Sequence, residues 1–213
     1  MRIGILMYLI ELLPFKLLIL AIPAFIAWRR TRSLPYVLSF ALFGIYLLTV
    51  IQVALLPLDV SPEYVRMMRQ SASWQQNVNL IPFYFGPYPQ TLADVLPTMA
   101  QNVLLTLPFG FGLSFVVRVR LRVFLALAPA SGLVIELAQL AISLLLGYPY
   151  RVVDINDVLM NGLGVLVGYG LFQVFIWLFT GAVQRLGISP TGLVAYVYNV
   201  ALRAQTDASG PLA

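Results

Sequence analysis

The sequence predicts an all-α membrane protein: a polytopic helical bundle of about five transmembrane helices, followed by a short C-terminal amphipathic helix. Hydrophobic residues make up 61% of its 213 residues and charged residues only 10%, whereas soluble domains contain about 25% charged residues. Several apolar stretches also reach the roughly 20 residues that a helix needs to cross the hydrocarbon core. The composition therefore excludes an ordinary soluble domain.

Five apolar stretches are long enough to cross a membrane, and they cover residues 3–28, 34–57, 99–117, 123–146 and 157–180. The first follows Arg2, as in a secretory signal, but it is too long and runs into Trp28-Arg29-Arg30 without a small-residue cleavage site. We therefore expect an extra N-terminal transmembrane helix within residues 1–33, ahead of a membrane domain at residues 34–180.

The arginines in the loops predict the orientation, because basic residues near helix ends stay cytoplasmic. With the N-terminus outside, eight arginines lie in cytoplasmic segments and four in outer ones. We therefore expect the N-terminus outside and the C-terminus inside. The net charge of +5 then belongs to loops that face anionic lipid, and no nucleic-acid partner is expected.

The outer insert, residues 58–98, is the one long polar segment between the spans. It contains Trp74 and an aromatic strip with several prolines, which is typical either of an anchor in the headgroup layer or of a ligand surface. Thr91-Leu-Ala-Asp94 and Thr98-Met-Ala-Gln101 both have capping-box spacing. They predict a short helix that leads into the third span.

The tail, residues 181–213, is less hydrophobic than the spans. Ser189-Pro190 is typical of a helix start, and Leu193, Tyr196 and Val200 follow at helical spacing. These residues predict an amphipathic helix on the cytoplasmic surface. We expect residues 205–213 to be disordered.

The sequence contains no cysteine and no histidine. Disulfides, Cys/His zinc sites, haem imidazole ligands and Ser-His-Asp chemistry are therefore excluded within one copy. Ligand binding or proton transfer must use carboxylates, arginines, amides and hydroxyls, and we expect no cofactor and no metal.

Three ionisable residues lie inside predicted spans, where each is expensive and therefore suggests a function. Glu11 and Lys16 flank Pro14, and we expect each to find a partner on a neighbouring helix or to reach the interface. Glu136 shares a helix face with Gln139 about 15 Å below the outer surface. This face forms either a polar clasp between helices or part of a site.

The densest polar segment begins at Arg151 and continues through Asp154, Asp157 and Asn161, whose i, i+3, i+7 spacing lines one stripe of the fifth span. Helix capping explains the two acids but neither Arg151 nor Asn161. In the same span, Gly164-x-x-x-Gly168 predicts a close helix contact.

In the third span, Asn102 precedes Pro108 and Gly110, which interrupt the helix and free a carbonyl for another partner. With the chosen orientation, the polar residues from these segments all fall in the outer half of the protein. They predict one outward-facing polar cavity formed by Asn79, Asn102, Glu136, Gln139, Arg151, Asp154, Asp157 and Asn161.

These motifs resemble, in the same order, those of the VanZ-like membrane family: Asn79-x-x-Pro82-Phe83, Asn102 with Pro108-x-Gly110, Glu136-x-x-Gln139, and Arg151-x-x-Asp154-x-x-Asp157-x-x-x-Asn161 with Gly164 and Gly168. The resemblance runs from about Gly44 to about Leu178. It implies a multi-pass protein of the bacterial cytoplasmic (inner) membrane with a role in the cell envelope. The family is named for a protein that lowers sensitivity to teicoplanin-type glycopeptide antibiotics.

Two functions remain open from the sequence. In the first, the cavity binds a polar ligand, a lipid-linked peptidoglycan precursor or a glycopeptide antibiotic, with Arg151 clamping an anion and the amides donating hydrogen bonds. In the second, an intramembrane enzyme uses Glu136 as acid or base, and Asp154 and Asp157 hold Mg²⁺ through waters. Membrane lipids are expected partners in both cases, and the oligomeric state stays open.

Overall fold

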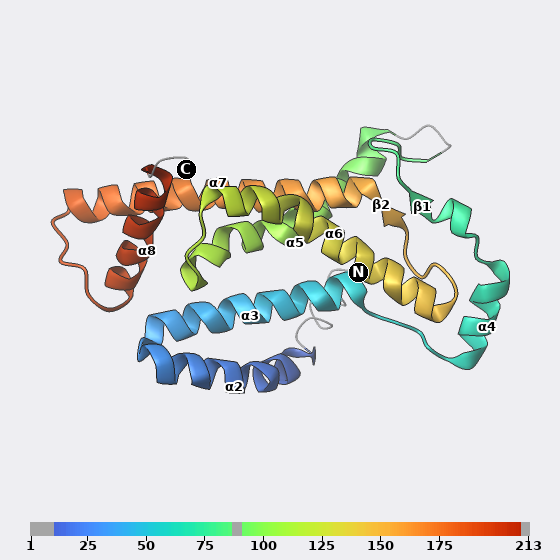
Figure 1. The fold of residues 1–213 in the computed structure, drawn as a ribbon, viewed down its shortest axis with the longest axis horizontal. Helices are drawn as coiled ribbons and strands as arrows, with labels where there is room; N and C mark the ends of the chain where they lie inside the picture. Colours follow the sequence, from blue (N-terminus) through green and yellow to red (C-terminus); the bar gives the residue numbers. More distant parts are fainter. Residues whose placement is uncertain (1–10, 87–90, 210–213) are drawn as a thin grey trace.

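The computed structural model describes residues 11–86 and 91–209, and these fold almost entirely into helices (Figure 1). In chain order the elements are α2 (Leu13–Thr31), α3 (Leu34–Leu55), α4 (Pro62–Ser71), η1 (Trp74–Gln76), β1 (Val78–Asn79), α5 (Leu92–Val116), α6 (Leu121–Leu146), β2 (Val153–Asp154), α7 (Ile155–Arg185) and α8 (Gly192–Ser209). The predicted all-α class is confirmed.

Four of these helices, α3, α5, α6 and α7, are long and apolar enough to cross a membrane. The chain is therefore a membrane-embedded protein. The described part of α2 does not qualify as a membrane-spanning helix. It contains three basic residues, Lys16, Arg29 and Arg30, within 19 residues. Residues 3–10 of the first predicted span lie outside the described residues, so the count of five spans and the orientation remain predictions.

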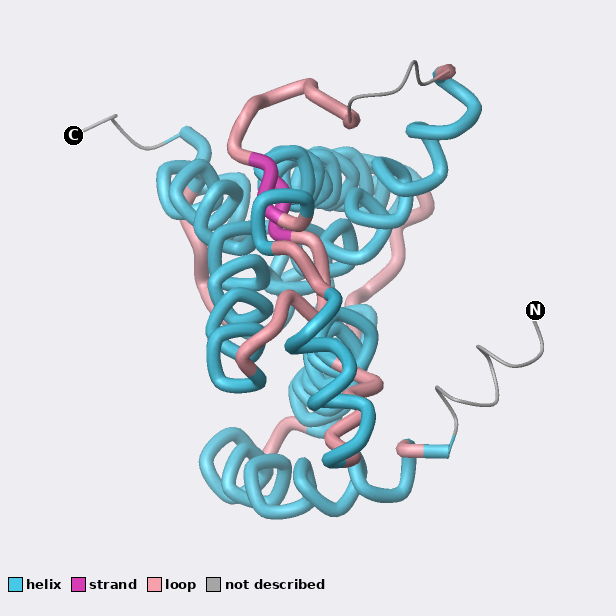
Figure 2. The backbone as a smooth tube through the Cα atoms, turned by 90° about the vertical axis from the view of Figure 1, so that its right-hand side faces the viewer, coloured by secondary structure: helices cyan, strands magenta, loops and turns pink. Residues whose placement is uncertain are grey.

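The long helix α7 is the centre of the bundle, with α5 and α6 packed against it (Figure 1). The hairpin of α2 and α3 lies alongside and contacts α5 through α3. Two small elements, β1 and β2, pair at the end of the bundle where α7 begins (Figure 2). This end holds most of the polar residues that the sequence singled out.

Glycines allow α7 to approach its neighbours closely. A Cβ added at Gly164 would overlap the Val103 carbonyl of α5, and one added at Gly168 would overlap the Leu107 carbonyl. Small residues at such positions let membrane helices pack backbone against backbone. The close helix contact predicted from Gly164 and Gly168 is therefore confirmed.

The third predicted span is longer than expected, because α5 begins at Leu92 and continues through Pro97. Asp94 accepts hydrogen bonds from the backbone N–H and the hydroxyl of Thr91, so this capping box is confirmed. Thr98 and Gln101 lie inside α5, so the second predicted box and the separate short helix were wrong. Once a helix is capped and has a neighbour to pack against, a proline can be accommodated within it.

The proline at position 108 leaves α5 continuous as well. The predicted interruption of the helix was therefore wrong. Pro108 lacks the N–H that would donate to the Leu104 carbonyl, and the hydroxyl of Tyr46 on α3 donates to the next carbonyl, that of Leu105, at 2.8 Å. The partner predicted for the freed carbonyl itself stays a prediction.

The C-terminal helix α8 packs onto the bundle. Val200 and Ala201 are buried with Phe172 and Ile176 of α7. The helix starts at Gly192, two residues after Pro190, and runs to Ser209. Predicted disorder over 205–209 was therefore wrong, because the apolar face of α8 finds a packing partner; residues 210–213 lie outside the described residues.

Lys16 is buried between α2 and α3, with 5% of its surface exposed. Its Nζ donates to Thr49 Oγ1 at 2.8 Å, so the predicted partner on a neighbouring helix is confirmed for this residue. Glu11 is exposed, and its role stays open.

Candidate functional site

A short parallel pairing brings the polar insert to the start of α7. Val78 pairs with Val153 and Asn79 with Asp154, and the Val153 N–H donates to the Asn77 carbonyl at 3.0 Å. Residues about 75 positions apart in the sequence therefore lie side by side.

Asp154 has two structural partners at this junction. Its Oδ1 accepts from the Asn156 backbone N–H at 2.8 Å, which caps the first turn of α7 as the sequence predicted. The same oxygen accepts from Asn79 Nδ2 at 2.9 Å. The carboxylate thus joins the insert to the helix.

Glu136 is turned into the protein and is 4% exposed. Its Oε2 accepts from the Asp154 backbone N–H at 3.0 Å, and Asp154, Asp157 and Arg151 lie near enough to interact with it electrostatically. A buried carboxylate needs a hydrogen-bond donor or a cation, which the Asp154 N–H and Arg151 supply, whereas Asp154 and Asp157 carry like charge. The prediction that this face of α6 points into the bundle is confirmed.

Asn156 is a buried member of the network that the sequence pattern missed. Its Oδ1 accepts from the Phe83 N–H at 2.6 Å and its Nδ2 donates to the Tyr84 carbonyl at 2.9 Å. Asn79 Nδ2 also donates to the Tyr84 carbonyl. Asn156 is not part of the i, i+3, i+7 pattern, so that pattern did not select it. Its position next to the N-cap was the available signal, because an amide there often bonds to loop backbone.

Asp157 and Asn161 extend the polar stripe into α7. Asn102 of α5 donates to Asp157 Oδ1 at 2.5 Å, and the hydroxyl of Thr106 donates to the Asn161 carbonyl at 2.6 Å. The side-chain Oδ1 of Asn161 is buried and has no hydrogen-bond partner among the described residues. An unpaired buried acceptor is costly unless a water or ligand donates to it.

Gln139 and Arg151 meet at a different place, the C-terminal end of α3. Gln139 Nε2 donates to the Ala54 carbonyl at 3.0 Å, and Arg151 Nη2 donates to the carbonyls of Val53 and Leu56 at 3.2 and 3.0 Å. The last carbonyls of a helix lack intrahelical donors and carry partial negative charge. Both side chains therefore hold α3 against the rest of the bundle.

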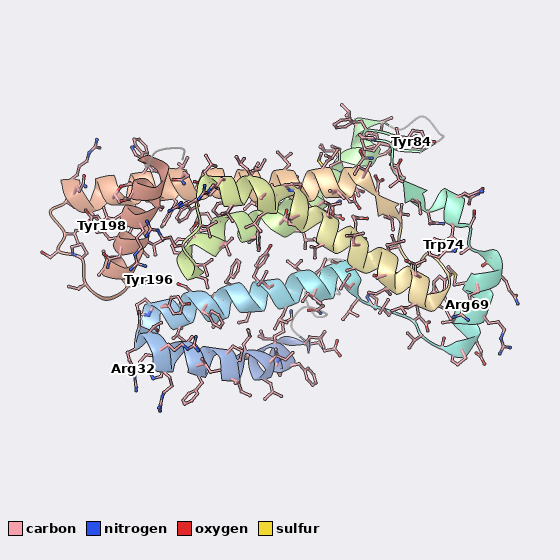
Figure 3. The ribbon with its side chains drawn as sticks, viewed as in Figure 1. Arg32, Arg69, Trp74, Tyr84, Tyr196 and Tyr198 are labelled. Atoms are coloured by element: carbon pink, nitrogen blue, oxygen red, sulfur yellow. The ribbon has the colours of Figure 1, made fainter. Side chains whose placement is uncertain are left out.

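A cavity of about 910 Å³ opens beside β1, β2 and the first turn of α7, at the end where Figure 3 labels Tyr84. Three aspartates and four side-chain amides line it, together with apolar and aromatic side chains. The polar lining residues are Gln75, Gln76, Asn79, Asp94, Thr98, Asp154, Asn156 and Asp157. No lysine or arginine is among the described residues that line it.

The structure divides the eight predicted site residues into four groups. Asn79, Asp154 and Asp157 line the cavity, while Asn102 and Glu136 stand behind them and bond to Asp157 and to the Asp154 backbone. Asn161 is one helical turn beyond Asp157, and Gln139 and Arg151 bind the end of α3. The predicted single cavity wall is therefore a lining with a supporting layer, and Asp94 and Asn156 are additions to it.

A membrane helical bundle with a buried acid and amide network at one end is the class that this fold and site define. The profile of the VanZ/LLP1 family matches residues 43–177, which includes most of α3 and α7 and everything between them. The chain therefore belongs to the VanZ/LLP1 family, as its motifs indicated. Searches of curated proteins and of solved structures found no match.

Proposed function

We propose that this protein is a multi-pass protein of the bacterial inner membrane that binds the polar part of a cell-envelope ligand, the headgroup of a lipid-linked wall precursor. The observation that carries the proposal is the cavity of about 910 Å³ with its fixed acid and amide lining. Its volume lies in the range of small-molecule sites. By holding or screening the precursor, the protein would lower sensitivity to teicoplanin-type glycopeptides.

The lining favours a ligand group that donates hydrogen bonds. Asp94, Asp154 and Asp157 offer carboxylate oxygens, which accept and do not donate when ionised. An amine, amide or hydroxyl group fits them, whereas a bare phosphate or carboxylate would be repelled. The peptide and sugar parts of a wall precursor carry such donors.

The anion-clamp role predicted for Arg151 has no support from its contacts. Its guanidinium donates to the Val53 and Leu56 carbonyls and is not part of the cavity lining. We therefore assign Arg151 to holding α3 in place and leave ligand recognition to the aspartates and amides.

The enzymatic alternative has less support. Glu136 does not line the cavity, and its Oε2 is engaged by the Asp154 backbone. Asp154 in turn is occupied by the helix cap and by Asn79. These acids are bound to structural partners, so we favour binding over catalysis.

The test measures binding and phenotype in the same variants. Native mass spectrometry of the protein purified from bacterial membranes should show a co-purifying wall precursor. Asp157→Asn should weaken binding of added precursor about tenfold or more, because a charge-assisted hydrogen bond is lost, and should reduce teicoplanin tolerance. Glu63→Gln is the matched control, since Glu63 is exposed on α4 and does not line the cavity.

Two outcomes contradict the proposal. One is that only bulk phospholipid co-purifies and added precursor does not bind. The other is that Asp157→Asn and Glu63→Gln behave alike in both assays. Complete loss of tolerance in Asp157→Asn with unchanged precursor binding would instead favour the enzymatic alternative.

A further inference from the structure

Charge is distributed unevenly along the bundle. Arginines gather at the end opposite the cavity, in the turn between α2 and α3, in the loop between α5 and α6, at the end of α7 and on α8: Arg29, Arg30, Arg32, Arg118, Arg120, Arg122, Arg185 and Arg203. Figure 3 shows Arg32 and Tyr196 at this end and Tyr84 at the other.

A small pocket of about 70 Å³ lies within this basic end, where α8 meets the loop that follows α5. Arg118 from the loop and Arg203 from α8 line it, together with Ser114, Tyr36 and Tyr196. The two arginines therefore come from separate elements and converge on one space.

The pocket is held in shape by the packing of α8. The hydroxyl of Tyr196 donates to the Phe115 carbonyl at the end of α5, and Val200 and Ala201 are buried against Phe172. The backbone that carries Arg203 is thus fixed relative to α5 before any ligand binds. This preorganisation reduces the entropy cost of binding.

The chemistry of the lining suits a phosphate group. A guanidinium has five N–H donors in a planar fork, so it can keep a contact within the protein and still bind phosphate oxygens. The volume of about 70 Å³ is several times the roughly 10–15 Å³ that one water molecule needs by the same kind of measure. The space therefore accommodates a group of the size of one phosphate.

The position favours a phosphate that belongs to a lipid. The pocket lies at the end of α5, a candidate membrane span, where Tyr36 and Tyr196 are of the type enriched at the membrane interface. We propose that Arg118 and Arg203 bind the phosphate of an anionic glycerophospholipid, and that this lipid ties α8 to the loop between α5 and α6. This site is independent of the cavity at the opposite end and of the function proposed for it.

The experiment compares lipid binding to the purified full-length protein and its variants. Native mass spectrometry with added phosphatidylglycerol or phosphatidylcholine should show preferential retention of phosphatidylglycerol. Arg203→Gln and Arg118→Gln should each lower its affinity about tenfold, from loss of a charge-assisted contact. Arg185→Gln is the matched control, because Arg185 is exposed at the same end but does not line the pocket.

Thermal unfolding in added lipid distinguishes loss of lipid binding from misfolding of a variant. Phosphatidylglycerol should raise the thermal midpoint of the wild type and of Arg185→Gln but not of Arg203→Gln, while all three should keep the same midpoint in phosphatidylcholine. If Arg203→Gln, Arg118→Gln and Arg185→Gln all lose the same amount of phosphatidylglycerol affinity, binding depends on diffuse surface charge and the proposed site is overturned. Displacement of the lipid by millimolar inorganic phosphate would overturn the assignment to a lipid.

Discussion

Replacing Gly132 on α6 by alanine tests how closely the helices behind the site must approach. A Cβ at this position would lie 2.5 Å from the Val158 carbonyl oxygen and 2.7 Å from the Val158 Cα. Both atoms belong to the backbone of α7 and cannot rotate away. The two helices must therefore separate by about 0.9 Å to reach the 3.4 Å at which ordinary contact begins.

A separation of this size has a predictable cost. A gap of 0.5 to 1 Å forfeits about a quarter to a half of each dispersion contact, and overpacking of a tight interior typically costs about 1–3 kcal/mol. Gly170→Ala provides the reference, because nothing lies within 4 Å of a Cβ at Gly170 on α7. Both substitutions gain the same helix propensity, so the difference between them isolates the steric cost.

We expect Gly132→Ala to unfold with a free energy about 1–3 kcal/mol lower than that of Gly170→Ala. The free energies would be measured by circular dichroism during SDS titration in mixed micelles. Glu136 lies one turn beyond Gly132 and bonds to the Asp154 backbone, so ligand binding should weaken together with stability. Equal stability of the two alanine variants would refute the packing argument.

Three further predictions concern polar contacts between elements. Thr49→Val should lower the free energy of unfolding by about 1–3 kcal/mol, because the buried Lys16 ammonium loses its hydroxyl acceptor. The Thr49→Ser variant keeps a hydroxyl, so its free energy of unfolding should stay near that of the wild type in the same SDS titration. Arg151→Lys should speed backbone amide hydrogen exchange at the end of α3, because a single ammonium replaces the guanidinium that binds two carbonyls. Unchanged exchange rates would contradict the role of Arg151 in holding α3. Asp154→Ala should lower the free energy of unfolding by about 1 kcal/mol, because the N-cap of α7 is lost. Asp154→Asn keeps an oxygen acceptor for the Asn156 N–H, so it should lower the free energy of unfolding less. Similar thermal midpoints for both variants would argue against capping.

Local physics made several elements predictable. The capping box at Thr91 and Asp94 needs only two side chains three residues apart, and the N-cap at Asp154 needs only the first turn of its own helix. The glycine pair in α7 predicts a close approach of some helix, although it does not say which one. The order of motifs was also sufficient to indicate the family.

Long-range partners could not be predicted in the same way. The sequence placed Arg151 in the cavity, yet its guanidinium binds carbonyls of α3 about 95 residues earlier in the chain. Asn156 was missed because its importance depends on the loop carbonyl of Tyr84. In both cases the side chain is adaptable, and its partner is decided by which backbone groups are left without a donor or acceptor nearby.

The amino-acid sequence by itself determined that this protein occupies a membrane, which apolar stretches become its long helices, and that the face of Glu136 and Gln139 turns inward. These properties depend on the solvation of apolar and polar groups and on hydrogen bonds within a few residues of one another. Only the tertiary structure decided that the acids and amides separate into a cavity lining and a supporting layer, and that Arg118 and Arg203 converge on one pocket at the opposite end. Those arrangements depend on how the helices pack, and close packing is a property of surfaces that meet from distant parts of the chain.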